Sequence, residues 1–161
     1  MNPTHLSLTE DHYTPPKIAV LARALMGRID VDPASSSIAN KIIKADKIFT
    51  KTDNGLIRPW HGRVFLNPPG GKTKNKSNLG LWWQKLLAEY ESGRATEAVF
   101  LSFQLSIFKI EQSVFDFPFI VPRQRLRFYS FDPKTNSLKP GQADENGVWR
   151  DRPSHDNAII Y

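Results

Sequence analysis

The stretch at residues 62–71 constrains the fold most, because a short apolar run meets two prolines and two glycines there. The run at 64–66 predicts a buried strand. The strand cannot continue through Pro68 and Pro69, which lack a backbone N–H. Asn67 is therefore placed at the strand's carboxyl end, where α/β proteins bind ligands. Its side-chain oxygen and the Pro68 carbonyl can together accept both hydrogens of a planar –NH₂ group, and so polarise that nitrogen towards an electrophile.

The whole chain has the size and composition of one domain. Its 161 residues are 40% hydrophobic and 24% charged, which is typical of a globular protein with a core. It contains no cysteine, no signal-peptide pattern and no run of about 18 apolar residues. We expect a cytoplasmic protein with no membrane association and no metal. Residues 1–12 form a polar arm and 13–161 form the domain.

The net charge of +6 favours a polyanionic partner, nucleic acid before membrane. The excess lies in two segments. Residues 70–78 have the composition of a flexible loop that orders on a phosphate backbone. In 123–128, extended backbone would put three arginines on one face and two apolar side chains on the other. Solvated lysines and local salt bridges are the alternatives. The candidate nucleic-acid contacts are Lys72, Lys74, Lys76, Arg123, Arg125 and Arg127.

The segment Tyr13-Thr14-Pro15-Pro16 predicts the start of a helix. Thr14 can cap the helix, and a proline suits its first turn. Gly27 ends it. Apolar residues follow at helical spacing and predict its core face: Ile18, Leu21, Ala22, Leu25 and Met26.

A strand over residues 28–32 breaks at Asp32-Pro33-Ala34-Ser35 and is followed by a helix over 37–44. A strand, a loop of small residues and a helix form a ligand-binding turn of the doubly wound type. No glycine occurs between Arg28 and Asn54, so serine and alanine must allow the close approach. A short strand at 47–49 and a tight turn at Asn54-Gly55 follow. Asp53 or Asn54 can hydrogen-bond an adenine amine, and Trp60 is either a ring platform or a core anchor.

The second half alternates helical and extended patterns. The apolar spacing predicts an amphipathic helix over 79–90 that ends at Gly93. Beyond it we expect a strand at 96–103, a helix at 105–115, a strand at 117–122, a polar loop at 130–153 and a final strand. His155-Asp156 suggests a catalytic dyad, which we discount because no nucleophile lies nearby in the sequence. His155 can instead line a base or DNA site.

These segments together resemble the phage and prophage DNA adenine methyltransferase family, over nearly all of residues 11–161. The motifs that carry the resemblance occur in the family's order: Tyr13-Thr14-Pro15-Pro16, Ile29-Asp30-Val31-Asp32-Pro33-Ala34-Ser35-Ser36, Asp53-Asn54-Gly55-Leu56, Trp60-His61-Gly62-Arg63 and Leu66-Asn67-Pro68-Pro69. The resemblance implies an S-adenosylmethionine cofactor and Asn67-Pro68-Pro69 as the catalytic motif. It also implies that Tyr13, Thr14 and Pro15 form a cofactor motif, that Asp32, Pro33, Ala34 and Ser35 lie under the methionine part, and that Asp53 and Asn54 contact the adenosine.

Gly70 departs from the usual family pattern, which has an aromatic residue there to stack on the flipped-out adenine. One branch of the family is similar to this chain in having Pro-Pro-Gly-Gly followed by lysines. The departure puts base specificity and catalysis in doubt. The candidate replacement rings are Trp82, Trp83 and Phe103.

We expect a single three-layer α/β domain with a mixed, mostly parallel, Rossmann-like sheet of the methyltransferase type. The expected activity is methyl transfer to the exocyclic amine of adenine in double-stranded DNA. Short segments, a partner chain or a homodimer would choose the target sequence. Three alternatives stay open: an RNA or protein amino-methyltransferase, a non-catalytic DNA-binding relic, and an unrelated binding module in which residues 67–69 are a turn.

Overall fold

Six strands form one mixed sheet in the computed structural model, which describes residues 12–140 and 155–161. Its first four strands run parallel, and β10 lies antiparallel between β6 and β7. The prediction of an α/β fold with a mixed, mostly parallel sheet is confirmed. In sheet order the strands are β2 (Lys47–Ile48), β1 (Val31–Asp32), β3 (Gly62–Leu66), β6 (Ala95–Ser102), β10 (Ala158–Ile160) and β7 (Phe119–Ile120).

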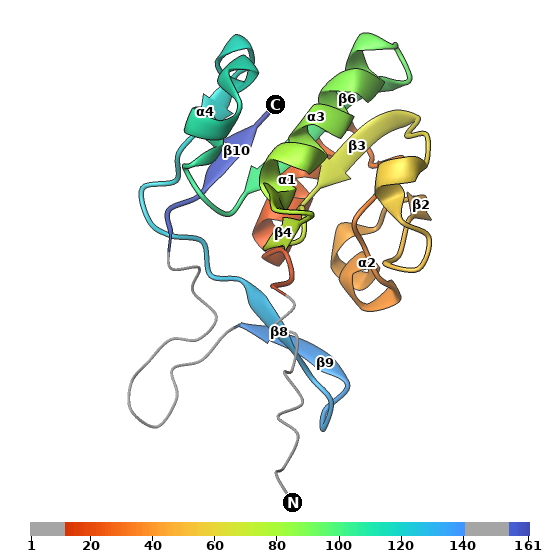
Figure 1. Ribbon diagram of the computed structural model, residues 1–161. Coiled ribbons are helices and arrows are strands. Elements are labelled where there is room, and N and C mark those ends of the chain that lie inside the picture. Colours follow the sequence, from red (N-terminus) through yellow and green to blue (C-terminus); the bar gives the residue numbers. More distant parts are fainter. Residues whose placement is uncertain (1–11, 141–154) are drawn as a thin grey trace, which may run out of the picture.

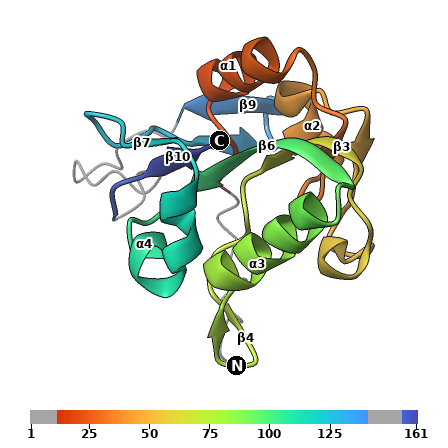
Figure 2. The same cartoon turned by 90° about the horizontal axis from the view of Figure 1, so that it is seen from above.

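Helices cover both faces of this sheet (Figure 2), which is the arrangement of a three-layer fold. Successive residues of a strand point to opposite faces. Phe65 of β3 therefore packs in a cluster with α1 (Pro16–Met26) and the end of α2 (Ser37–Ile43). Its neighbours Val64 and Leu66 pack in a second cluster with α3 (Asn78–Glu91).

The first helix begins as the prolines predict but is not capped as we expected. Pro15 is its N-cap and Pro16 its first residue, and no side chain caps its free N–H groups. The prediction that Thr14 caps the helix is therefore wrong, because the Thr14 hydroxyl is engaged elsewhere, as described below. Leu21 and Leu25 were also assigned to the core face, yet they are 54% and 56% exposed. Ala19 takes part in the core instead.

Two hairpins replace segments that the sequence predicts to be loops. β4 (Lys72–Thr73) pairs with β5 (Lys76–Ser77), so the flexible basic loop is an ordered hairpin. Its two turn residues, Lys74 and Asn75, both have positive φ, as the favoured two-residue hairpin turn requires. β8 (Tyr129–Asp132) likewise pairs with β9 (Ser137–Pro140) inside the predicted loop 130–153, the rest of which lies outside the described residues.

The predicted helix over 105–115 is two short helices, α4 (Ile107–Ile110) and the 3₁₀ helix η2 (Gln112–Asp116). Glu111 separates them because its backbone is extended. The strand predicted at 117–122 is shorter than expected and is β7 alone. Another 3₁₀ helix, η1 (Gly55–Ile57), follows the turn at Asn54.

Candidate functional site

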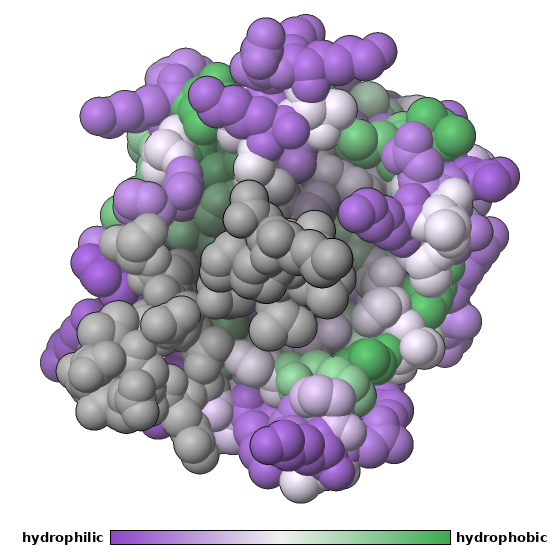
Figure 3. All heavy atoms as spheres, turned by 60° about the horizontal axis from the view of Figure 1, so that its bottom comes forward, coloured by the Kyte–Doolittle hydropathy of each residue, from purple (hydrophilic) through white to green (hydrophobic). Residues whose placement is uncertain are grey.

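The parallel strands end at one edge of the sheet, and most predicted site residues lie there. The register pairs Val31 with Val64 and Leu66 with Phe100, so the ends of β1, β3 and β6 are neighbours. In Figure 1 this edge faces downward, towards the β8–β9 hairpin, whereas antiparallel β10 points upward. Figure 3 looks onto the edge and shows hydrophilic side chains along much of its rim.

Asn67 is half-buried at this edge, and its amide nitrogen is held by the chain itself. Its Nδ2 donates to the His12 carbonyl at 3.2 Å and to the Thr14 hydroxyl at 3.2 Å. A carbonyl can only accept, so the nitrogen must be the atom that faces His12. No hydrogen bond from a described residue reaches the Asn67 Oδ1 or the Pro68 carbonyl oxygen. Two acceptors are thus left on adjacent residues.

The segment that holds Asn67 is in turn fixed by the β8–β9 hairpin. Tyr13 and Tyr129 exchange two backbone hydrogen bonds, of 3.0 and 2.9 Å. The His12 ring lies edge-on to the buried Phe128 ring, with centroids 5.9 Å apart. The predicted cofactor residues Tyr13, Thr14 and Pro15 are therefore brought beside Asn67.

Asp32 ends β1, next to β3, and its carboxyl is buried. Its side chain accepts a hydrogen bond from the Ala34 N–H at 3.2 Å. It forms no ion pair with any residue that the structure describes. Burial raises the pKa of the Asp32 carboxyl to about 7, because water no longer stabilises its charge. A buried carboxyl without a cation is the natural partner for a cationic ligand group.

The loop after Asp32 carries a second buried polar group. The Ser35 hydroxyl oxygen forms no hydrogen bond of regular geometry with a described residue, but it lies close enough to the Asp32 carboxyl to lower the pKa of that group, against the larger effect of burial. The backbone around it is rigid, because the Ser35 N–H donates to the Phe49 carbonyl and the Phe49 N–H to the Asp32 carbonyl. Ser36 caps α2 by accepting from the Ala39 N–H at 3.1 Å.

The Asp53–Gly55 turn packs directly on the Asp32 loop. A Cβ at Gly55 would lie 2.0 Å from the Pro33 carbonyl oxygen, so only glycine fits. The buried Trp60 ring donates to the Gly55 carbonyl at 2.8 Å and stacks on Trp82. Of the two predictions for Trp60, the core anchor is therefore confirmed.

Asp53 and Asn54 directly precede Gly55, so this contact brings their turn beside the Asp32 loop. Asp53 also stabilises its own turn. Its carboxylate accepts from the Thr50 hydroxyl and N–H at 2.6 and 2.8 Å. These hydrogen bonds hold the pKa of the Asp53 carboxyl below its usual range. Asn54 is exposed and has a positive φ.

The six basic candidates are exposed but do not form one row. The lysines lie on the β4–β5 hairpin, which Asn78 closes by donating to the Gly70 carbonyl at 2.8 Å. The arginine segment alternates in burial as predicted, with Phe128 buried and Leu126 half-buried. It is not a strand, however, and Arg125 pairs with Asp156 at 3.0 Å.

Two of the three candidate replacement rings are unavailable. Trp82 and Trp83 are 6% and 3% exposed and belong to the core beneath α3. The prediction that either ring replaces the missing aromatic at Gly70 is wrong, because helix packing turns both inward. Phe103 is half-buried at the end of β6 and remains a candidate.

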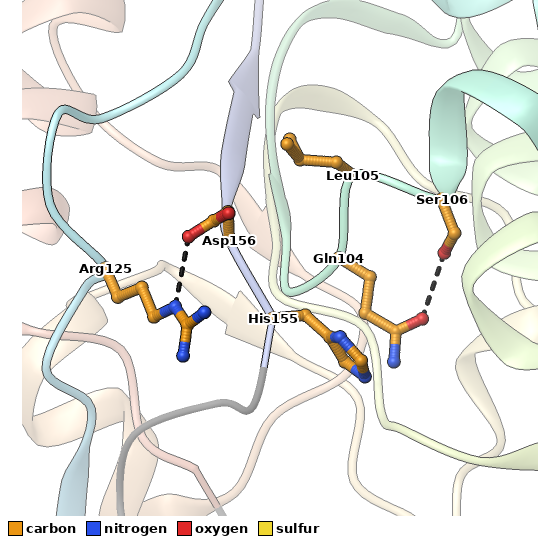
Figure 4. Close-up of a pocket in the computed structure, with 6 residues that line it drawn as sticks. All are labelled: Gln104, Leu105, Ser106, Arg125, His155 and Asp156. Carbon is orange, nitrogen blue, oxygen red and sulfur yellow. Dashed lines mark hydrogen bonds and ion pairs between the residues drawn. The ribbon is translucent and has the colours of Figure 1, made fainter.

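Sequence reasoning missed a hollow of about 260 Å³ after the end of β6 (Figure 4). The only sequence signals for any of its residues were the alternating arginines, which include Arg125, and the His155-Asp156 pair. Its walls come from the segment after β6 and from two segments about twenty and fifty residues later. The lining residues are Gln104, Leu105, Ser106, Arg125, His155 and Asp156.

Among the described residues, no helix is long and apolar enough to cross a membrane, and no three His, Asp or Glu side chains gather as a metal site. Comparison with protein-family models, with curated proteins and with solved structures found no match.

Proposed function

We propose that this protein is an S-adenosylmethionine-dependent DNA methyltransferase that acts on the exocyclic amine of adenine. One observation carries the proposal. Both hydrogens of the Asn67 amide are directed at acceptors of the chain itself, and among the described residues neither Oδ1 nor the carbonyl of the next residue, Pro68, receives a hydrogen bond. A fixed pair of acceptors suits a group with two hydrogens on one nitrogen.

The chemistry of this pair fits a planar amine. When two oxygens accept its hydrogens, electron density on the nitrogen rises, and the nitrogen is held in one orientation. Positioning and preorganised dipoles of this kind supply much of the rate enhancement in group transfer. Asn67 and Pro68 need no proton transfer of their own, in keeping with a site built from a neutral amide and a carbonyl.

The residues of the Asp32 loop fit the proposed cofactor. S-adenosylmethionine supplies a methyl group on a sulfonium, and it carries an ammonium and hydroxyl groups as handles. Asp32 offers a buried carboxyl that no cation of the described chain satisfies, and Ser35 offers a buried hydroxyl beside it. Gly55 lets the Asp53–Gly55 turn pack directly on the Asp32 loop, so we assign this loop and Asp53-Asn54 to the cofactor.

Nucleic acid is the substrate class that the charges favour. The Lys72–Thr73/Lys76–Ser77 hairpin begins two residues after Pro69-Gly70, at the same lip as Asn67. Its lysines are exposed and form no ion pair with a described residue. Free ammonium groups beside the acceptor pair suit DNA phosphates.

Transfer of a tritiated methyl group to DNA, RNA and protein, measured side by side, tests this proposal. Label in DNA that is recovered as N6-methyladenine is the expected result. Label found only in RNA or protein would support methyl transfer to an amine but contradict DNA as the substrate. Single-molecule sequencing of DNA from cells that express the protein would then give the recognition site.

A DNA-binding relic is the second candidate, and Gly70 is the observation that favours it. A Cβ at Gly70 would meet nothing within 4 Å, so no described side chain covers the place where the family's ring would lie. Calorimetry with S-adenosylmethionine separates the two candidates. Heat of binding is expected for the enzyme, and its absence together with intact DNA binding would favour the relic.

A further inference from the structure

Two of the side chains that line the hollow after β6, Gln104 and Arg125, carry hydrogen-bond donors whose positions are fixed by the chain (Figure 4). Ser106 donates from its hydroxyl to the Gln104 Oε1 at 2.9 Å. The buried Ser102 hydroxyl also donates to the Gln104 carbonyl at 2.7 Å. With its oxygen engaged, Gln104 turns its –NH₂ group towards the His155 ring and into the hollow.

Arg125 stands across the hollow from Gln104, and Asp156 holds it through one atom only. The carboxylate accepts from Nε at 3.0 Å. A guanidinium has five N–H donors, and no described residue accepts from the four on its two terminal nitrogens. Asp156 therefore orients the guanidinium without occupying the fork that binds phosphates in a bidentate manner.

The hollow lies at the same edge of the sheet as the acceptor pair. β10 is antiparallel and pairs Ala158 with Ser102, so residues 155–157 lie beside the carboxyl end of β6. β6 is the direct neighbour of β3, which carries Asn67. A nucleic acid strand that delivers a base to Asn67 thus has its backbone within reach of both walls.

We propose that this hollow holds a backbone phosphate of the DNA strand that carries the target adenine. The Gln104 amide and the terminal nitrogens of Arg125 are the donors, His155 lines the wall between them, and Asp156 is a positioning residue. This inference rests on the proposed function. It assigns one phosphate contact to the hollow and separates it from the contacts of the lysine hairpin.

Ethylation interference on a duplex that contains the recognition site tests the contact. Ethylating a phosphate removes its charge, so binding is lost where that phosphate is needed. Gln104→Ala and Arg125→Ala should make the same one or two neighbouring positions insensitive and weaken DNA binding roughly fivefold to tenfold. Lys74→Ala is the matched control, and it should change other positions. Circular dichroism would verify that each variant is folded.

Variants of Asp156 show whether this carboxylate orients the Arg125 guanidinium or only adds negative charge to the hollow. If only net charge mattered, Asp156→Ala and Asp156→Asn would both tighten DNA binding. Orientation predicts that Asp156→Ala weakens binding about threefold, whereas Asp156→Asn keeps an acceptor for Nε and does not weaken it. Tightening by both variants would overturn the role of Asp156.

An interference map that is the same in wild type, Gln104→Ala and Arg125→Ala would overturn the phosphate site while DNA methylation stays intact. Failure of the proposed methyltransferase function would give a different result. In that case the wild-type protein transfers no methyl group to DNA, and if it also binds no DNA, the phosphate site falls with it.

Discussion

The Asp32 loop and the Asn67 lip, by which we mean Asn67 and Pro68 at the end of β3, follow neighbouring strands. Their polar side chains differ in charge and in how far the protein itself satisfies them. The Asn67 amide is neutral, and both its hydrogens are used within the protein. The Asp32 carboxyl is ionisable and buried, and within the described chain it has a backbone N–H but no cation. At Asn67 the donor is therefore used within the protein and the acceptors are left for a ligand, whereas at Asp32 burial makes the anion costly until a cation covers it.

Asn67→Ala is the strongest way to break this comparison. It removes one of the two acceptors but none of the contacts of the Asp32 loop. We expect methyl transfer to fall roughly a hundredfold to a thousandfold, as when one preorganised group is removed from other active sites. Cofactor affinity, measured by calorimetry, should stay within a few-fold of wild type. Equal loss of both would give Asn67 a role in folding instead.

Asp32→Asn tests the other strand end. The amide keeps the hydrogen bond from the Ala34 N–H but cannot pair with a cation. We expect S-adenosylmethionine affinity to fall roughly a hundredfold, which corresponds to about 2.7 kcal/mol. The free energy of unfolding of the ligand-free protein at pH 8 should rise at the same time, by roughly 2–4 kcal/mol, because a buried anion is removed. A simultaneous fall in stability would contradict this role.

The same carboxyl predicts how stability and binding change with pH. Its pKa is raised in the folded state, so its stabilising contribution is fully present below the unfolded value near 4 and is lost as the pH rises to about 7. Cofactor binding requires the anion and should therefore weaken as the pH falls from 8 to 6. Calorimetry across this window should show the decline in wild type and not in Asp32→Asn.

Gly55→Ala sharpens the comparison without touching a polar group. The added methyl would lie 2.0 Å from the Pro33 carbonyl oxygen, so the Asp32 loop must shift. We expect a loss of about 1–3 kcal/mol in the free energy of unfolding and roughly a tenfold loss of cofactor affinity. Gly70→Ala is the matched control, because its methyl would meet nothing within 4 Å and should change stability by less than about 0.5 kcal/mol. If Gly55→Ala and Gly70→Ala changed stability and cofactor affinity equally, the contact between Gly55 and the Asp32 loop would have no role in cofactor binding.

The sequence predicted the parts that depend on local pattern. The apolar run before Pro68 correctly predicted β3, and the break at Asp32-Pro33 correctly predicted a strand, a loop and a helix. Gly27 correctly predicted the end of α1. It missed features that depend on distant contacts. Thr14 does not cap α1, because the tertiary fold brings its hydroxyl to Asn67, fifty-three residues away. The hollow at Gln104 joins three segments that only the β6–β10 pairing brings together.

Hairpins were missed for another reason. The turn at Lys74-Asn75 requires positive φ at both positions, and a lysine there gives no turn signal of the Asn-Gly kind. The basic composition of the segment suggested flexibility, whereas closure by Asn78 orders it.

Thr14→Val is the smallest expected effect and the one most specific to the lip. Valine has nearly the same shape but cannot accept the hydrogen bond from the Asn67 Nδ2, which keeps only its bond to the His12 carbonyl. The loss of one hydrogen bond, about 1 kcal/mol, should lower kcat roughly fivefold and leave cofactor affinity unchanged. Thr14→Ser restores the hydroxyl and should restore kcat. A loss of affinity at constant kcat would instead place Thr14 with the cofactor, as the resemblance implies, and would separate its hydroxyl from the acceptor pair.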